Sequence, residues 1–340
     1  MNSPPTNLLV IQLRQIGDVV LTTPIPHILK AAWPGCRVTF LTERPSDQLL
    51  GGNPYIDEVL VSNRKGTWRD TLQLAAELRE RRFDYVLDFM ANPRSAILSF
   101  LSGARARVSC QGGVRGVFYT LRVKPKDGYA SEYKSSVLVS IGIESEWNRP
   151  EIFLTVAEKL GALALRDHLL KPGANRLVTV DPSHRRATRR WPARHYGELC
   201  AALYGRLGAL PVVLWGPGEE ALAEEVVGAS EGTALKAPLT ALREMAALIG
   251  AADLHVGNCS APRHIAVAVG TPSFTVLGAT SSGWTHPATE HADLALGLSC
   301  QPCNSNTCER GFACLEDLAA ERVFGELSAW ANSCLGWRGP

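Results

Sequence analysis

Long hydrophobic runs are absent from this sequence of 340 residues: nowhere do about 18 uncharged apolar residues follow one another, as a membrane-spanning helix requires. The first ten residues carry no positive charge ahead of an apolar stretch, so no secretory signal is visible. An excess of one charge is missing too, because 35 Lys and Arg against 33 Asp and Glu leave a net charge of +2. We therefore expect a cytoplasmic protein that binds no nucleic acid, and peripheral contact with a membrane stays open.

Low-complexity tracts and short-period repeats are also absent, and 46% hydrophobic and 20% charged residues are ordinary for a globular chain. Short apolar runs alternate with longer helical patterns through both halves, which is typical of parallel α/β layers. The expected strands are residues 8–13, 37–41, 58–61, 85–89, 105–110, 177–180, 212–215, 253–256 and 274–277. The expected helices include residues 68–82, 193–207, 219–227, 242–249 and 261–269.

The length suits two domains better than one hydrophobic core. We expect Rossmann-like, doubly wound domains at residues 1–150 and 176–315, joined by a linker around a helical segment near residues 156–170. In sheets of this kind ligands bind beyond the carboxyl ends of the strands. The loops that follow the strands are therefore the places to look for a site.

The first expected strand leads into Arg-Gln-Ile-Gly-Asp and not into G-x-G-x-x-G, which disfavours a dinucleotide-dependent oxidoreductase. Gly17 permits a tight turn there, and Asp18 starts the next helix. The Asp18 carboxylate could face a cleft between the domains or merely cap the helix. The residues of this loop leave both alternatives open.

Two loops of the second half combine features of anion sites. Four arginines and a histidine lie between residues 184 and 190, just before Pro192 at the expected start of a helix. Guanidinium groups beside a helix amino terminus favour a phosphate, although an arginine run is often a solvated face. Farther along, Gly257 and Ser260 allow a diphosphate close to the backbone amides that open the helix at residues 261–269.

Glu219 follows the strand expected at residues 212–215. Its carboxylate could accept hydrogen bonds from a ribose, or it could simply favour the first turn of a helix. Cys259 has no neighbouring general base except His264, so we read its thiol as packed and not as a nucleophile.

Nine cysteines occur, and they bunch in one place only, at Cys300, Cys303, Cys308 and Cys314. Four thiolates could close a tetrahedral zinc site. The spacing C-x2-C-x4-C-x5-C is tight, however, and lacks the long interval between two zinc knuckles. Free or redox-labile thiols are the favoured interpretation, and no cofactor or metal is expected.

Five motifs in order carry a family resemblance: LLVIQLRQIGDVVLTTP, RRATRRWP, WGPGEE, VGNCSAPRHIAVAVGTPSFTVLG and CQPCNSNTCERGFAC. The chain resembles glycosyltransferase family 9, the ADP-heptose:lipopolysaccharide heptosyltransferases. The resemblance implies a GT-B fold, with two Rossmann-like domains facing a central cleft and a helix in residues 316–340 that crosses back to the first domain. It also implies inverting, metal-independent transfer of heptose from an ADP-heptose-like nucleotide diphosphate donor to the lipopolysaccharide core or a related glycan. That acceptor would be lipid-anchored at the inner face of the membrane.

The same resemblance assigns roles to single residues. Asp18 stands where the family has its proposed catalytic base. Arg189 takes the place of a lysine that meets the donor phosphates, and Glu219 resembles the acidic residue near the ribose. The turn that receives the diphosphate matches Ser260, Ala261 and His264.

One motif departs from the family. Where members usually read Asn-Asp-Ser-Gly-Pro-Met-His, this chain reads Asn-Cys-Ser-Ala-Pro-Arg-His, which places Cys259 and Arg263 in the expected donor pocket. A thiol cannot supply the fixed negative charge and two acceptors of an aspartate. The alternative function is therefore a non-catalytic or repurposed nucleotide-sugar-binding relative.

Overall fold

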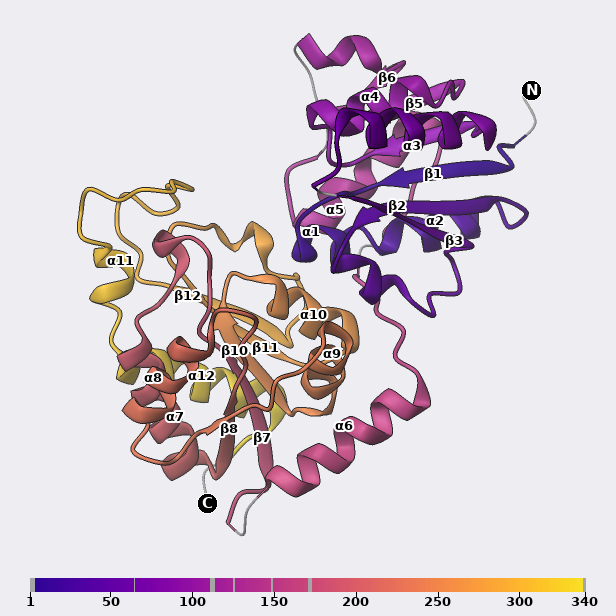
Figure 1. Ribbon diagram of the computed structural model, residues 1–340. Helices are drawn as coiled ribbons and strands as arrows, with labels where there is room; N and C mark the ends of the chain where they lie inside the picture. The colour runs from indigo at the N-terminus through magenta and orange to yellow at the C-terminus, as the bar shows by residue number, and fades with distance from the viewer. Residues whose placement is uncertain are drawn as a thin grey trace. The chain divides into compact units, whose positions relative to one another are not determined.

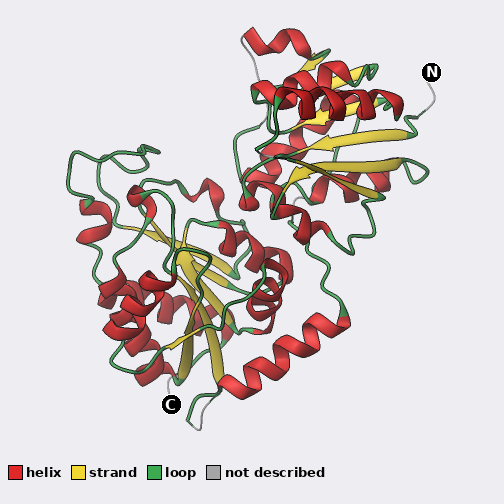
Figure 2. Cartoon of the chain, viewed as in Figure 1, coloured by secondary structure: helices red, strands yellow, loops and turns green. Residues whose placement is uncertain are grey.

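The computed structural model describes residues 4–63, 65–110, 114–124, 126–147, 149–170 and 173–338. The chain divides into two compact units, Met1–Phe153 and Leu154–Pro340. Each unit is built around one six-stranded parallel sheet covered by helices on both faces (Figure 1 and Figure 2). Two parallel α/β units are what the sequence predicts, so the fold class is confirmed. None of the described helices combines the length and the apolar character needed to cross a membrane.

The sheet of the first unit has the strand order β3-β2-β1-β4-β5-β6. Its strands are β1 (Asn7–Ile11), β2 (Arg37–Glu43), β3 (Glu58–Ser62), β4 (Tyr85–Asp88), β5 (Ala106–Ser109) and β6 (Leu121–Arg122). Its α-helices are α1 (Ile16–Val20), α2 (Pro24–Ala32), α3 (Trp68–Glu80), α4 (Pro93–Leu101) and α5 (Ala130–Ser135). The 3-10 helices are η1 (Ser46–Leu50), η2 (Val114–Phe118) and η3 (Ser136–Ile141).

The central strand β1 is apolar from Leu8 to Ile11 because both of its faces are buried there. Leu8 and Val10 join the core that includes Ile25 of α2, whereas Leu9 and Ile11 join the core on the opposite face. This alternation follows from the two-residue period of a strand. A continuous apolar run in the sequence therefore marks the middle of a parallel sheet.

The second unit repeats the arrangement with the strand order β12-β11-β10-β7-β8-β9. Its strands are β7 (Arg176–Asp181), β8 (Ala209–Val213), β9 (Leu235–Lys236), β10 (Leu254–Asn258), β11 (Ser273–Leu277) and β12 (His291–Ala295). Its α-helices are α6 (Val156–Leu169), α7 (Ala193–Leu207), α8 (Glu220–Ala229), α9 (Leu242–Ala251), α10 (Ala261–Val269), α11 (Ala313–Glu316) and α12 (Ala320–Leu335). The 3-10 helices are η4 (Ala187–Arg189) and η5 (Ser282–Trp284).

Two helices extend the second unit beyond the range expected from the sequence. Helix α6, interpreted as part of the linker, packs on α9, and Arg166 donates to Asp253 at 2.8 Å. Helix α12 packs on α7 and inserts Phe324 and Leu327 into the core of this unit. The contacts of both helices therefore belong to the second unit, and a crossing of the terminal helix to the first domain stays a prediction.

The two sheets share one topology. Counted within each unit, the strand order is 3-2-1-4-5-6, and it reverses direction between the first and fourth strands. In the first unit this switch point lies between β1 and β4, and in the second between β7 and β10. Ligands of doubly wound sheets bind at such a point, beyond the carboxyl ends of the strands. The loops after these four strands are therefore the candidate sites.

Candidate functional site

Asp18 lies at the switch point of the first unit, in the first turn of α1, and its side chain is half-buried. The Thr22 hydroxyl, one turn farther on, donates back to the Asp18 carbonyl at 2.7 Å and lies 3.4 Å from Gln12 Oε1, just after β1. No described residue donates a hydrogen bond to the Asp18 carboxylate. Its two oxygens therefore keep their capacity to accept a proton.

Lys134 of α5 is a cation near this carboxylate that the sequence analysis missed. Its ammonium group is buried and donates to Gln12 Oε1 at 2.8 Å. Burial lowers the pKa of Lys134, and the nearby negative charge of Asp18 works in the opposite direction. Gln12 in turn donates to the carbonyl of Arg14, in the loop that leads to Asp18. Lys134 thus supports the loop that carries the candidate base.

Two buried carboxylates complete the edge of the first sheet. Glu43, at the end of β2, faces the guanidinium groups of Arg14 at 3.6 Å and Arg94 at 3.5 Å. Asp88, at the end of β4, accepts from the Tyr119 hydroxyl at 2.6 Å. Burial raises the pKa of Asp88, and the hydrogen bonds that its carboxylate accepts act in the opposite direction. Both groups are engaged with partners, in contrast to Asp18.

In the second unit Asn258 joins the two loops at the switch point. Its side-chain oxygen accepts from the Trp191 amide at 3.0 Å, and its amide donates to the Pro182 carbonyl at 2.8 Å. Gly257 is required beside it, since a Cβ would lie 2.9 Å from the Asp181 carbonyl oxygen. The arginine-rich loop is therefore held against the turn that precedes α10.

Arg189 ends η4, which a second set of contacts fixes in place. The Ala279 amide donates to the Thr188 carbonyl at 2.9 Å, and a Cβ on Gly278 would come within 2.4 Å of that oxygen. The Arg189 guanidinium is half-buried, with Cys259 and Cys303 close enough to affect it electrostatically. Burial lowers the pKa of Arg189, and the neighbouring Arg186 adds to this. The structure thus brings Arg189 to the start of α10.

Ser260 is the N-cap residue of α10, but its side chain does not cap the helix. Its hydroxyl donates to the carboxylate of Asp181 at the end of β7. The first-turn N–H groups of Ala261 and Arg263, between which Pro262 has none, are therefore left without a side-chain cap and form a place for an anion. His264 is buried in the same helix, and burial lowers its pKa well below the ordinary value. His264 is thus a neutral imidazole and adds no positive charge.

Asp181 is a second residue that the sequence analysis missed. It is buried and accepts from the Ser183 amide at 3.0 Å and from the Ser183 hydroxyl at 2.9 Å. Burial raises the pKa of Asp181 to about 6, its hydrogen bonds lower it, and the charge of Glu219 raises it further. A carboxyl group that loses its proton near neutral pH therefore lies beside the anion site.

Glu219 lies at the same edge of the second sheet, as the N-cap residue of α8. One of its carboxylate oxygens accepts from the Gly216 amide at 2.9 Å, which closes its own turn. The bond gives Glu219 a structural role, although in the turn before the helix and not in its first turn. A role toward a ribose stays a prediction, which the remaining oxygen could serve.

The two departures from the family motif have different surroundings. Cys259 is buried directly before the N-cap residue of α10, and its thiol is close enough to the Arg189 guanidinium to influence it electrostatically. The Arg263 side chain is buried, and its guanidinium donates to the Thr285 hydroxyl at 2.5 Å. The Thr285 hydroxyl in turn donates to the Asp293 carboxylate. The Arg263 charge is therefore directed partly toward β12, whereas Cys259 lies in the site itself.

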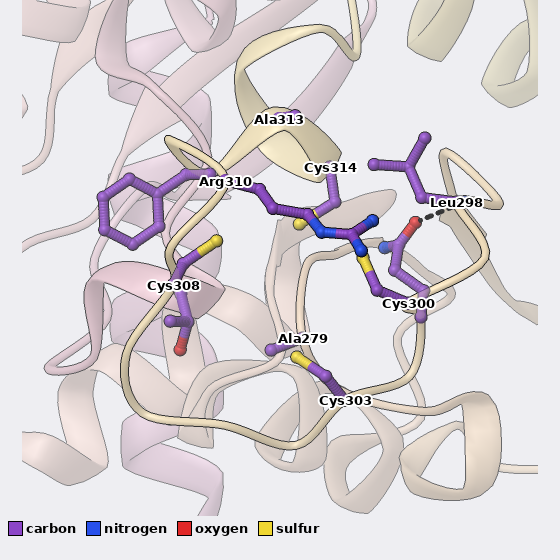
Figure 3. Close-up of a pocket in the computed structure, with 11 residues that line it drawn as sticks. Ala279, Leu298, Cys300, Cys303, Cys308, Arg310, Ala313 and Cys314 are labelled. Atoms are coloured by element: carbon purple, nitrogen blue, oxygen red, sulfur yellow. Dashed lines mark hydrogen bonds between the residues drawn. The ribbon is translucent and has the colours of Figure 1, made fainter.

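The four clustered cysteines line one pocket beside this site (Figure 3). Their sulfur atoms point toward its middle, and Arg310 reaches across it. Burial raises the pKa of Cys314, and the nearby thiols of Cys308, Cys300 and Cys303 add to this. All four are free cysteines, and within the described ranges no three His, Cys, Asp or Glu side chains are arranged to hold a metal ion. The choice between free thiols and a metal site stays a prediction.

Comparison with known proteins decides the family. The family model described as glycosyltransferase family 9 (heptosyltransferase) matches residues 71–313, more than half of the chain. The chain belongs to glycosyltransferase family 9. Lipopolysaccharide heptosyltransferase 3 of Escherichia coli strain K12 is 27% identical over 299 residues, which cover 82% of this chain and 84% of that protein. Membership of family 9 supports glycosyltransferase activity for this chain.

Solved structures agree on the fold of this family 9 chain. The glycosyl transferase family 9 protein of Veillonella parvula DSM 2008 superposes with a TM-score of 0.81 at 22% identity, covering 96% of this chain and 97% of that one. The heptosyltransferase WaaC of E. coli, solved with ADP-2-deoxy-2-fluoro heptose, superposes with a TM-score of 0.71 at 19% identity, covering 95% of this chain and 99% of that one. The GT-B expectation is therefore confirmed as a fold.

Proposed function

We propose that this family 9 chain transfers heptose, with inversion, from an ADP-heptose-like donor to the lipopolysaccharide core or a related lipid-anchored glycan. The observation that carries the proposal is the pairing of two sites within one family 9 chain. One switch point presents Asp18 with an unengaged carboxylate, and the other presents Arg189 beside the uncapped start of α10. A base and an anion site are the two elements that direct displacement at a sugar requires.

Asp18 is the general base of the proposed reaction. An acceptor hydroxyl attacks the anomeric carbon as its proton passes to the Asp18 carboxylate, and the bond from that carbon to the diphosphate breaks on the opposite side. Inversion follows from this single displacement. Lys134 acts through Gln12 on the loop ahead of Asp18 and holds the carboxylate in position.

The departing diphosphate is held in the second unit. Arg189 and the first amide groups of α10, from Ala261 on, supply positive charge where negative charge develops. Ser260 joins them when its hydroxyl turns from Asp181 toward the phosphate. His264, as a neutral imidazole, contributes a hydrogen bond only, and Glu219 contacts the ribose. In this proposal the guanidinium takes the role that a metal ion has in other transferases, so the reaction is metal-independent.

Phosphate binding by Arg189 and by the start of α10 needs no aspartate at position 259. The proposal therefore includes catalytic activity although Cys259 replaces the family's aspartate. The relative WaaC was solved with an ADP-linked fluoro heptose, which makes ADP-heptose the first donor to test. A repurposed pocket would instead prefer another nucleotide-sugar. Thermal shift with a panel of nucleotide-sugars separates the two cases, because a ligand that binds only the folded protein raises the melting temperature.

The full test uses the purified chain, ADP-heptose and heptose-deficient lipopolysaccharide, with chelator present. We expect an acceptor that gains the mass of one heptose, released ADP, and the inverted anomeric configuration by NMR. The Asp18→Asn variant serves as the inactive control. Transfer by neither ADP-heptose nor any other nucleotide-sugar, with no donor raising the melting temperature, would overturn the proposal.

A further inference from the structure

The first unit exposes large apolar side chains on one side of its sheet. Phe100 of α4 is 47% exposed and Val117 of η2 is 74% exposed, and Ile97 and Leu121 are exposed as well. We name these four residues the α4–η2–β6 face. They form a connected surface, because α4 packs against η2 and the Phe100 and Phe118 rings meet edge-on at 5.7 Å. Figure 1 shows α4 close to β5 and β6 in this unit.

The stretch of chain that carries most of this face has charges of a single sign. Residues 89–126 contain seven Arg and Lys and no Asp or Glu, although the whole chain has a net charge of only +2. Arg122 and Lys124 are exposed and make no ion pair with any described residue. The Arg107 guanidinium lies 5.6 Å from the centre of the Phe100 ring, and among the described residues it donates to the backbone carbonyls of Phe118 and Ala104 and to no carboxylate.

Two carboxylates of the adjacent helix α3 have hydrogen-bond or ion-pair partners of their own. Asp70 accepts from the Thr67 amide and hydroxyl in the capping box of its own helix. Glu77 pairs with Arg81 at 2.7 Å. Arg94 faces Glu43, but the exposed Arg122 and Lys124 have no ion-pair partner among the described residues. The face therefore combines exposed apolar groups with exposed cations that no described carboxylate pairs.

This combination distinguishes between possible occupants. A second copy bound through the same surface would bring two sets of cations together, which opposes a symmetric dimer. A bilayer with anionic lipid headgroups satisfies both features, since headgroups pair with Arg and Lys while the apolar side chains enter the interface. Phenylalanine beside arginine suits that boundary because the ring is apolar and the cation stays in the headgroup layer.

We propose that the α4–η2–β6 face docks the first unit on an anionic membrane surface. The docking is peripheral, reversible and sensitive to salt. It places the unit that carries Asp18 at the membrane. The inference concerns binding alone, so it is tested without donor, acceptor or turnover, and its failure would leave the proposed transfer reaction untouched.

The experiment is co-sedimentation of the full chain with vesicles of pure phosphatidylcholine or with 30% phosphatidylglycerol, a composition of about one anionic lipid in three. We expect the parent protein to bind the anionic vesicles and to be released at high salt. The apolar variant is Phe100→Ser with Val117→Ser, and the charge variant is Arg122→Ser with Lys124→Ser. Each cation near an anionic surface is worth roughly fivefold in partitioning, so the charge variant should lose roughly twentyfold or more. We expect a loss of about tenfold or more from the apolar variant.

Matched control variants come from the second unit. Val156, at 74%, is as exposed as Val117, and Leu160 is 61% exposed, so Val156→Ser with Leu160→Ser removes similar apolar surface. Lys159→Ser with Arg322→Ser removes two exposed cations. Both controls should bind vesicles within twofold of the parent. Unchanged melting temperatures show that the variants are folded.

Several results would overturn the proposal. These are a parent that does not bind anionic vesicles, a parent that binds both vesicle types equally at low salt, or face variants that bind like the controls. Light scattering provides a further check: a parent dimer that the Phe100→Ser, Val117→Ser variant converts to monomer would make the occupant a second copy.

Discussion

The two units share a strand order but place opposite chemistry at the same topological position. After β1 the first unit presents the Asp18 carboxylate, supported by the buried Lys134 through Gln12. After β7 and β10 the second unit presents Arg189 and the small-residue start of α10. The shared topology determines where a ligand can bind, and the loop residues determine what binds there.

The two units also differ in the partners of a buried aspartate at the sheet edge. Asp88 in the first unit is held by the amides of Met90 and Ala91 as well as by Tyr119. Asp181 in the second unit relies on Ser183 and Ser260, with the charge of Glu219 nearby. Asp181 is thus linked to the anion site through the hydroxyl of Ser260, whereas Asp88 supports the sheet edge. The same residue type serves the two units differently.

The largest expected effect comes from removing the base of the first unit. Asp18→Asn should reduce transfer by ~10²–10⁴-fold, because the amide cannot take the acceptor proton. ADP affinity, measured by calorimetry, should stay within a few-fold since the anion site lies in the other unit. Asp47→Asn, in the same unit, is the control and should keep parental activity. Transfer by Asp18→Asn within twofold of the parent would remove Asp18 from the mechanism.

The next effect concerns Asp181 and the pH dependence of stability. Its pKa is about 6 in the folded protein, against an ordinary aspartate value of 3.8 in the unfolded chain, so folding favours the protonated form. The resulting stabilisation is complete below pH 3.8 and is lost as the pH rises through about 6. Asp181→Asn imitates the protonated form, so above that window the variant should gain about 3 kcal/mol over the parent.

Urea unfolding at about pH 4.5 and about pH 8 measures the difference in the free energy of unfolding between Asp181→Asn and the parent. The contributions of other titrating groups cancel in this difference. This difference in the free energy of unfolding should be large at the higher pH and small at the lower one. An equal difference at both values would show that Asp181 does not titrate in this window.

Arg189 tests the anion site of the second unit. Arg189→Ala should weaken ADP binding by roughly 10- to 100-fold, because a charged hydrogen bond is worth about 1.5–3 kcal/mol. Adenosine, which lacks phosphates, should bind almost as before. Arg190→Ala is the matched control, since its neighbouring side chain is exposed. Equal losses of affinity for adenosine and ADP would contradict a phosphate contact.

The smallest effect is expected from Lys134, which acts on Asp18 indirectly. Lys134→Met keeps most of the volume but removes the charge and the bond to Gln12. We expect kcat to fall by about tenfold, the free-energy equivalent of one hydrogen bond, with little change in KM. The acidic limb of the pH profile of kcat should also move to higher pH. Lys134→Arg should restore part of kcat; an unchanged pH profile with both variants would reduce Lys134 to a structural role.

Local sequence signals predicted the alternating architecture because buried parallel strands are continuous apolar runs and the helices between them have an apolar face that repeats every three to four residues. The prediction was wrong in detail at β8, which begins at Ala209 and not at residue 212. Pro211 interrupts the apolar pattern there, yet the pairing with β7 extends the strand across it. The strands β6 and β9 have two residues each, too few for a periodic signal.

The sequence by itself determined the fold class, the family and the positions of Asp18, Arg189 and Ser260, because each lies next to a strand or helix end that local residues specify. Only the tertiary structure decided which distant groups surround them. Gln12 and Lys134 are 122 residues apart, and Ser260 and Asp181 are 79 apart, yet each pair is hydrogen-bonded. Burial of these polar groups, their shifted pKa values and the partner of Arg263 arise from packing between elements, which no local pattern encodes.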